Sequence, residues 1–145
     1  MAPELLRSGE PGKEKGLAET SDAGRPADAI LLENLQIPAS LGVTAGEREL
    51  RRPVRIDLVI ARSLSAAGRS DRVEETVDYG AIYRVVEAVA GQGEHHLVEA
   101  LGERVAAALL SEFEMDWVEV TVRKAKPLAG ALDSAGIRLT RYRDT

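Results

Sequence analysis

The sequence predicts an α+β domain in which two helices cover one face of an antiparallel sheet. Three segments, 53–61, 117–123 and 136–141, alternate apolar and polar residues with the period of two that β-strands require. Between the first two of these segments, residues 79–112 repeat apolar residues at helical spacing. An apolar run at 29–35 adds one more strand. The resulting order, β-β-α-α-β-β, groups the helices apart from the strands.

The first two strands are joined by a polar turn. Residues 29–35 suit a strand that bends at Pro38, and residues 44–48 form the turn. The next strand, 53–61, buries one face because every second residue is apolar. These apolar residues are Val54, Ile56, Leu58 and Ile60.

Two helices follow a segment at 63–71 that reads as a loop with room for one helical turn. The first begins at Tyr79 and ends at Gly91, because glycine stops helices. The second runs from about His96 to Glu112. The first helix has an apolar stripe of Ile82, Val85, Val86 and Val89, and the second has one of Leu97, Leu101, Val105, Ala108 and Leu109.

The last two strands, 117–123 and 136–141, are separated by a loop at 124–130 that holds two lysines and a proline. The 145 residues suffice for one domain with its own core. Residues 28–145 form this domain. Residues 1–27 read as a disordered tail, since they are rich in Gly, Pro, Ser, Glu and Lys and show no period.

Composition excludes several classes of function. A net charge of −5 disfavours nucleic-acid binding, and no apolar run is long enough to span a membrane. The chain has no cysteine, which removes thiolate nucleophiles and cysteine zinc sites. His95 and His96, the only histidines, are adjacent and cannot easily turn to one metal. We therefore expect a cytoplasmic protein without a metal site.

Four polar residues lie at the ends of predicted elements: Glu47, Tyr79, Glu99 and Lys124. Each has a purely structural explanation. Glu47 suits a solvated turn, Tyr79 a helix start, and Lys124 a strand end. Glu99 suits a first helical turn, where the macrodipole favours a carboxylate. Spacing alone therefore identifies none of them as functional.

These four residues, with the motifs around them, resemble the dihydroneopterin aldolases over residues 29–141. The resemblance rests on Leu-Gly-Val at 41–43 before Glu47, Val-Arg-Ile-Asp-Leu at 54–58 and Thr-Val-Asp-Tyr-Gly at 76–80. It also rests on Leu-Val-Glu-Ala-Leu-Gly-Glu-Arg-Val-Ala at 97–106 and on Val-Arg-Lys at 122–124 with a proline at 127. The family fold is the T-fold, whose β-β-α-α-β-β units join their sheets into a barrel around a tunnel. The resemblance implies a homo-oligomer, a tetramer or an octamer, with active sites shared between subunits.

The implied activity is a lyase reaction of folate biosynthesis. Retro-aldol cleavage of 7,8-dihydroneopterin yields 6-hydroxymethyl-7,8-dihydropterin and glycolaldehyde. The pterin contains an imine that accepts the electron pair released by the breaking bond. The enzyme therefore needs no cofactor, neither a metal nor a Schiff-base lysine.

The resemblance also assigns roles to residues. Glu99 binds the amino edge of the pterin, and Val98 and Val77 frame its ring. Lys124 transfers protons through water, although Lys126 is a second lysine in the same segment. Tyr79 from an adjacent subunit assists protonation of the intermediate.

Glu47 lines the side-chain end of the pocket in this assignment. Two other functions stay open. A dihydroneopterin or dihydroneopterin triphosphate epimerase shares the fold and much of the site, and a non-catalytic T-fold module would bind a pterin without turning it over. Product analysis separates the three.

Overall fold

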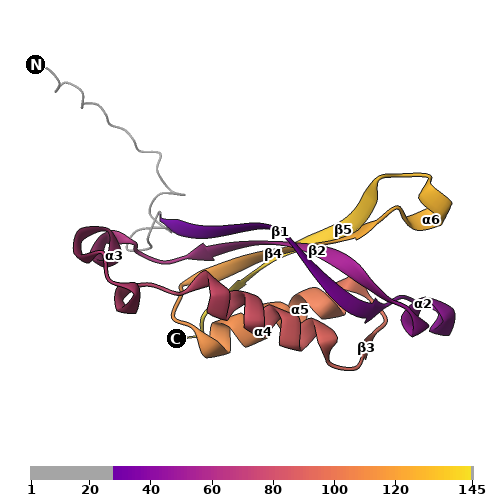
Figure 1. Cartoon of the computed structure of the whole chain (residues 1–145), viewed down its shortest axis with the longest axis horizontal. Coiled ribbons are helices and arrows are strands. Elements are labelled where there is room, and N and C mark those ends of the chain that lie inside the picture. The colour runs from indigo at the N-terminus through magenta and orange to yellow at the C-terminus, as the bar shows by residue number, and fades with distance from the viewer. Residues whose placement is uncertain (1–27, 145) are drawn as a thin grey trace, which may run out of the picture.

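A five-stranded sheet forms one layer of the protein, in the order β3-β1-β2-β4-β5. The computed structural model describes residues 28–144. Its strands are β1 (Ala29–Leu41), β2 (Arg51–Ala61), β3 (Glu94–His95), β4 (Trp117–Ala125) and β5 (Ser134–Tyr142). The four long strands pair antiparallel, so the predicted sheet is confirmed (Figure 1).

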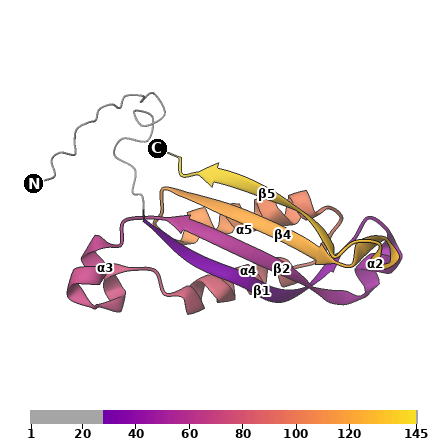
Figure 2. The same ribbon diagram turned by 90° about the horizontal axis from the view of Figure 1, so that it is seen from above.

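Two long helices, α4 (Tyr79–Gly91) and α5 (Val98–Glu112), form the second layer. Both lie on the same face of the sheet, as Figures 1 and 2 show. Both begin where the spacing places them, within two residues. Asp78 caps α4, because its Oδ1 accepts from the Gly80 N–H at 3.0 Å. The predicted two-layer α+β architecture is therefore confirmed.

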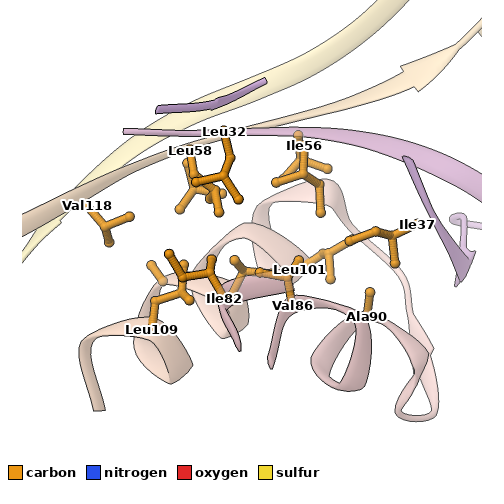
Figure 3. Close-up of a cluster of buried hydrophobic side chains, with 14 of the residues drawn as sticks. Leu32, Ile37, Ile56, Leu58, Ile82, Val86, Ala90, Leu101, Leu109 and Val118 are labelled. Carbon is orange, nitrogen blue, oxygen red and sulfur yellow. The ribbon is translucent and has the colours of Figure 1, made fainter. Parts of the chain in front are cut away.

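The core lies between the two layers and is almost entirely aliphatic (Figure 3). The residues of β2 predicted to face it, Val54, Ile56, Leu58 and Ile60, are buried, and β4 adds the buried Val118, Val120 and Val122. The helices contribute Ile82, Val86, Ala90, Leu101, Val105, Ala106 and Leu109. Because the core sets the angle of the helices on the sheet, it also fixes where their first turns lie.

A β-bulge interrupts the pairing of β1 with β2. Leu32 pairs with Leu58 and Leu35 with Ile56, so β1 carries one extra residue between them. Asn34 occupies the bulge with φ of 60°, a conformation that asparagine tolerates better than most residues. Its N–H donates to Asp57 Oδ1 at 2.6 Å. The bulge and the Asp57 side chain therefore stabilise each other.

Some short elements differ from the prediction. The turn expected at 44–48 contains a helical turn, α2 (Ala45–Glu49). The helical turn expected in the loop at 63–71 is α3 (Ser65–Ser70), and the 3₁₀ turn η3 (Val73–Glu75) follows it. A tight turn, α6 (Pro127–Gly130), joins β4 to β5. The two-residue β3 pairs parallel with the end of β1, at Ser40 and Leu41, so the sheet is not antiparallel throughout.

Two other expectations need correction or fall outside the structure. Leu97 was expected in the apolar stripe of the second helix, but it precedes α5 and is 51% exposed. The predicted tail, residues 1–27, lies outside the described residues. None of the helices in residues 28–144 has the length and apolar character needed to cross a membrane.

Candidate functional site

Glu47 and Lys124 form an ion pair at one end of the molecule. Lys124 lies near the end of β4, and its Nζ donates to Glu47 Oε2 at 3.1 Å. Glu47 lies in α2, 77 residues earlier in the chain. Both side chains are accessible, 45% for Glu47 and 31% for Lys124. The fold thus brings together two of the predicted catalytic residues while leaving them open to a substrate.

The Glu47 carboxylate is held on both of its oxygens. Oε1 accepts from the Thr44 backbone N–H at 3.1 Å, while the Thr44 hydroxyl accepts from the Glu47 N–H at 3.2 Å. This reciprocal capping box orients the side chain. The Thr44 N–H, and after it the Lys124 ammonium, lower the pKa of Glu47 to about 2. Glu47 is therefore a fixed carboxylate at neutral pH.

We predict that Lys124→Met raises the pKa of Glu47 but leaves it below 4.5, the ordinary value. The reason is that the Thr44 N–H, the largest cause of the lowered pKa, survives the substitution. Carbon-detected NMR titration of the glutamate carboxyl groups measures the shift. A Glu47 pKa unchanged from the wild type would contradict the ion pair, and Lys126→Met serves as the matched control.

Gly42 allows α2 to lie close to β1. A Cβ on Gly42 would lie 2.2 Å from the Cβ of Glu47, so only glycine fits there. The Gly42 N–H also donates to the backbone oxygen of His95 at 3.0 Å. His95 lies three residues before Val98, where α5 begins. Glu47 is thereby linked through Gly42 to the segment that leads into α5.

Val98 and Glu99 occupy the first turn of α5, near α2 and β3 (Figure 1). Glu99 is exposed and Val98 is half-buried. Two of the three predicted substrate-binding residues thus lie at the same end of the molecule as the Glu47–Lys124 pair. A carboxylate, an apolar side chain and an ion pair at one end suit a flat heterocycle that carries N–H donors.

Val77 and Tyr79 lie at the other end. Val77 is buried, whereas Tyr79, the first residue of α4, is 70% exposed. The 13 residues of α4 separate Tyr79 from the end that carries Glu47, a span of about 20 Å at the helical rise. One subunit therefore does not bring Tyr79 to Lys124.

His95, which directly precedes the predicted second helix, is buried in the structure. It is 1% exposed, its Nε2 lies 3.0 Å from the Ala90 oxygen, and Arg104 Nη1 lies 2.7 Å from its Nδ1. Arg104 can only donate, so Nδ1 accepts and Nε2–H donates to Ala90. Burial, and to a smaller extent Arg104, lower the pKa of His95. No period reveals this burial, because β3 has only two residues.

We predict that acid destabilises the fold through His95. Its pKa is lowered in the folded protein, so the unfolded chain takes up a proton first as the pH falls below about 6.5. Below about pH 6.5 the free energy of unfolding falls by up to about 1.4 kcal/mol for each pH unit. Above about pH 6.5 the stabilising contribution of neutral His95 is fully present. Urea unfolding between about pH 5 and 8 measures the slope, which should flatten in His95→Gln. An equal slope in that variant contradicts the prediction.

Two other kinds of site, a metal site and a separate pocket, have less support in the structure. Residues 28–144 contain no group of three or more His, Cys, Asp or Glu side chains that could hold a metal ion. A hollow of about 430 Å³ lies between α5 and the end of β5, lined by Glu103, Ser111 and Arg141 among others. None of the predicted site residues lines it.

Comparison with known proteins points to one family. The family model for dihydroneopterin aldolase matches residues 30–140. A dihydroneopterin aldolase of Staphylococcus epidermidis is 32% identical over 120 residues, which cover 81% of this chain and 98% of the relative.

Solved structures agree with the fold. Escherichia coli dihydroneopterin aldolase in complex with neopterin has a TM-score of 0.75 and 26% identity, covering 79% of this chain and 98% of that one. A dihydroneopterin aldolase of Burkholderia thailandensis bound to guanine has a TM-score of 0.69 and 25% identity, covering 89% and 100%.

Proposed function

The chain belongs to the dihydroneopterin aldolase family, and on that premise we propose that it cleaves 7,8-dihydroneopterin into 6-hydroxymethyl-7,8-dihydropterin and glycolaldehyde. This lyase reaction belongs to folate biosynthesis, a pathway of soluble pterins, and we expect it to run in the cytoplasm. The observation that carries the proposal is the Glu47–Lys124 ion pair, at the same end of the fold as the first turn of α5, which contains Glu99.

The reaction asks the protein only to move protons and to orient the substrate. Removal of the proton from the second side-chain hydroxyl lets its carbon become the aldehyde of glycolaldehyde. The bond between the first and second side-chain carbons breaks, and its electron pair enters the imine of the pterin ring. Protonation of the first side-chain carbon then restores the imine. Because the substrate supplies the electron sink, neither a metal nor a lysine Schiff base is needed.

Glu99 is the residue that we assign to pterin recognition. Neopterin and guanine, the ligands of the two solved relatives, share an amino-pyrimidinone edge with parallel N–H donors. A carboxylate accepts two such donors as it does those of an arginine. Glu99 is exposed in the first turn of α5 and free to rotate toward a ligand, and the apolar Val98 beside it would contact the ring.

Lys124 and Glu47 are the residues that we assign to proton transfer. The ion pair orients the Lys124 ammonium and keeps Glu47 ionised, which suits a lysine that exchanges protons with the side-chain hydroxyl through a water molecule. Glu47 would line the end of the pocket that receives the side chain. Lys126 has φ of 49° beyond the end of β4, a less regular position than that of Lys124.

The remaining residues would come from a neighbouring subunit. Tyr79, with Val77 behind it, lies too far from Lys124 within one chain, about 20 Å along α4. Both edges of the sheet also have backbone groups that can pair with a strand of a neighbouring subunit. Within residues 28–144, β5 has one neighbour, and β1 has a second neighbour only at Ser40 and Leu41. A tetramer or octamer that joins these edges into a barrel would complete each site with the neighbour's tyrosine.

Product analysis tests the function. The protein is incubated with dihydroneopterin in the presence of a metal chelator, and the products are separated by chromatography. Glycolaldehyde and hydroxymethyl-dihydropterin in equal amounts support the aldolase. Monapterin alone would support an epimerase instead, and unchanged substrate would support a binding module. Borohydride added during turnover should leave the protein mass unchanged, because no Schiff base forms.

A further inference from the structure

Arg48, the residue after Glu47, makes more polar contacts than its place in a surface turn requires. Its Nη1 donates to the backbone oxygens of Gly42 at 3.0 Å and Val43 at 2.8 Å. Its Nε donates to Glu94 Oε1 at 2.9 Å. The Arg48 side chain is only 14% exposed, although Glu94 is 59% exposed. A planar guanidinium suits such a set of acceptors in fixed directions.

The α2 helix depends on contacts of this kind. It has five residues, none of them buried, and isolated helices of this length are unstable in water. Consecutive helical residues point about 100° apart. Glu47 can therefore face Lys124 while Arg48 faces β3. Arg48 and Glu47 are adjacent in α2, so contacts that hold Arg48 also restrain the backbone that carries Glu47.

The backbone of Glu94, the ion-pair partner of Arg48, is paired in the sheet. Glu94 pairs with Ser40 of β1, and the next residue, His95, is buried between Arg104 and the Ala90 oxygen. Three residues after His95, α5 begins and carries Glu99. Arg48 thus connects the element that carries Glu47 to the segment that carries Glu99.

We propose that Arg48, through Glu94 and the Gly42 and Val43 carbonyl groups, is a positioning residue that holds Glu47 against Lys124. The proposal rests on the proposed function for its kinetic consequence. Its structural consequence, the orientation of the Glu47 carboxylate, does not depend on which reaction the site catalyses.

The test compares Arg48→Met, Glu94→Gln and a control, Arg143→Met. Arg143 forms a surface ion pair with Glu114 at 3.9 Å and follows the end of β5, at the end of the molecule opposite α2 (Figure 1). Arg48→Met should lower kcat for dihydroneopterin by about tenfold to a hundredfold, because displaced catalytic groups lose rate rather than affinity. KM should change by less than about threefold, since Glu99 is untouched. Glu94→Gln removes only the charge of one partner and should have a smaller effect in the same direction.

A second readout separates positioning from general stability. In wild-type protein the Glu47 carboxyl should not titrate between about pH 3.5 and 7, whereas in Arg48→Met it should titrate within that range. Wild-type kcat together with an unchanged Glu47 titration in Arg48→Met would overturn the proposal. So would equal losses in Arg143→Met. If Arg48→Met does not fold, Glu94→Gln decides by the same two readouts. If the wild type cleaves no substrate, the proposed function fails and the titration still decides.

Discussion

Lys124→Ala is expected to lower kcat by about 10²- to 10⁴-fold, the usual contribution of a positioned proton-transfer group. The amino edge of the pterin would still meet Glu99, which lies on a different element. The dissociation constant for neopterin should therefore stay within about threefold of the wild-type value. Stopped-flow turnover and calorimetric titration with neopterin measure the two quantities.

The matched control is Lys126→Ala, since both lysines lie in the same segment and carry the same charge. Of the two lysines, it is Lys124 that donates to Glu47 in the structure, so Lys126→Ala should keep kcat within about threefold. The reverse pattern, an active Lys124→Ala and an inactive Lys126→Ala, would move the catalytic role to Lys126. A Lys124→Ala protein that no longer binds neopterin would show that the lysine contributes to binding rather than to proton transfer.

The main elements could be predicted because their periods are long and uninterrupted. Strand β2 alternates buried and accessible residues from Val54 to Ile60, and α4 follows a stripe that ends at glycine. The short elements carry too few residues to show a period. The parallel pairing of β3 rests on two residues, Glu94 and His95, whose partners in β1 are more than 50 positions away in the chain. Such contacts depend on the packed core, which no local pattern describes.

One missed element did leave a signal in the sequence. Thr44-Ala45-Gly46-Glu47 has the spacing of a capping box, in which the first residue and the residue three later cap each other. Gly46 disfavours helix and no apolar run follows, so the local sequence favours a turn over a helix. The helical turn explains why Glu47 is oriented, and why its carboxylate lies near Lys124 rather than in solvent.

The placement of the site residues could be predicted only in part. Glu47, Glu99 and Lys124 were identified through resemblance, and the fold gathers them at one end without that information. Arg48 and His95 were not identified, because a charged residue in a turn and a histidine before a helix both have ordinary solvated explanations. Their roles depend on carbonyl groups and on partners that only the folded chain supplies.

Mixed oligomers should recover activity that neither parent variant has. Lys124→Ala and Tyr79→Phe each remove one group of the proposed site, but from different subunits. In a statistical mixture, about a quarter of the sites combine an intact lysine with a neighbour's intact tyrosine. Co-expression with two affinity tags, followed by tandem purification, yields the mixed oligomers, whose turnover is compared with that of each parent.

A matched mixture makes this result specific to shared sites. Glu47 and Lys124 lie in the same chain, so mixing Glu47→Gln with Lys124→Ala leaves every site defective and should recover nothing. Recovery in the first mixture alone requires that Tyr79 acts across a subunit boundary, as its place at the far end of α4 from the Glu47–Lys124 pair implies. No recovery in either mixture would mean that Tyr79 and Lys124 of one site come from the same subunit. Equal recovery in both would show that the subunits exchange back into parent oligomers with residual activity.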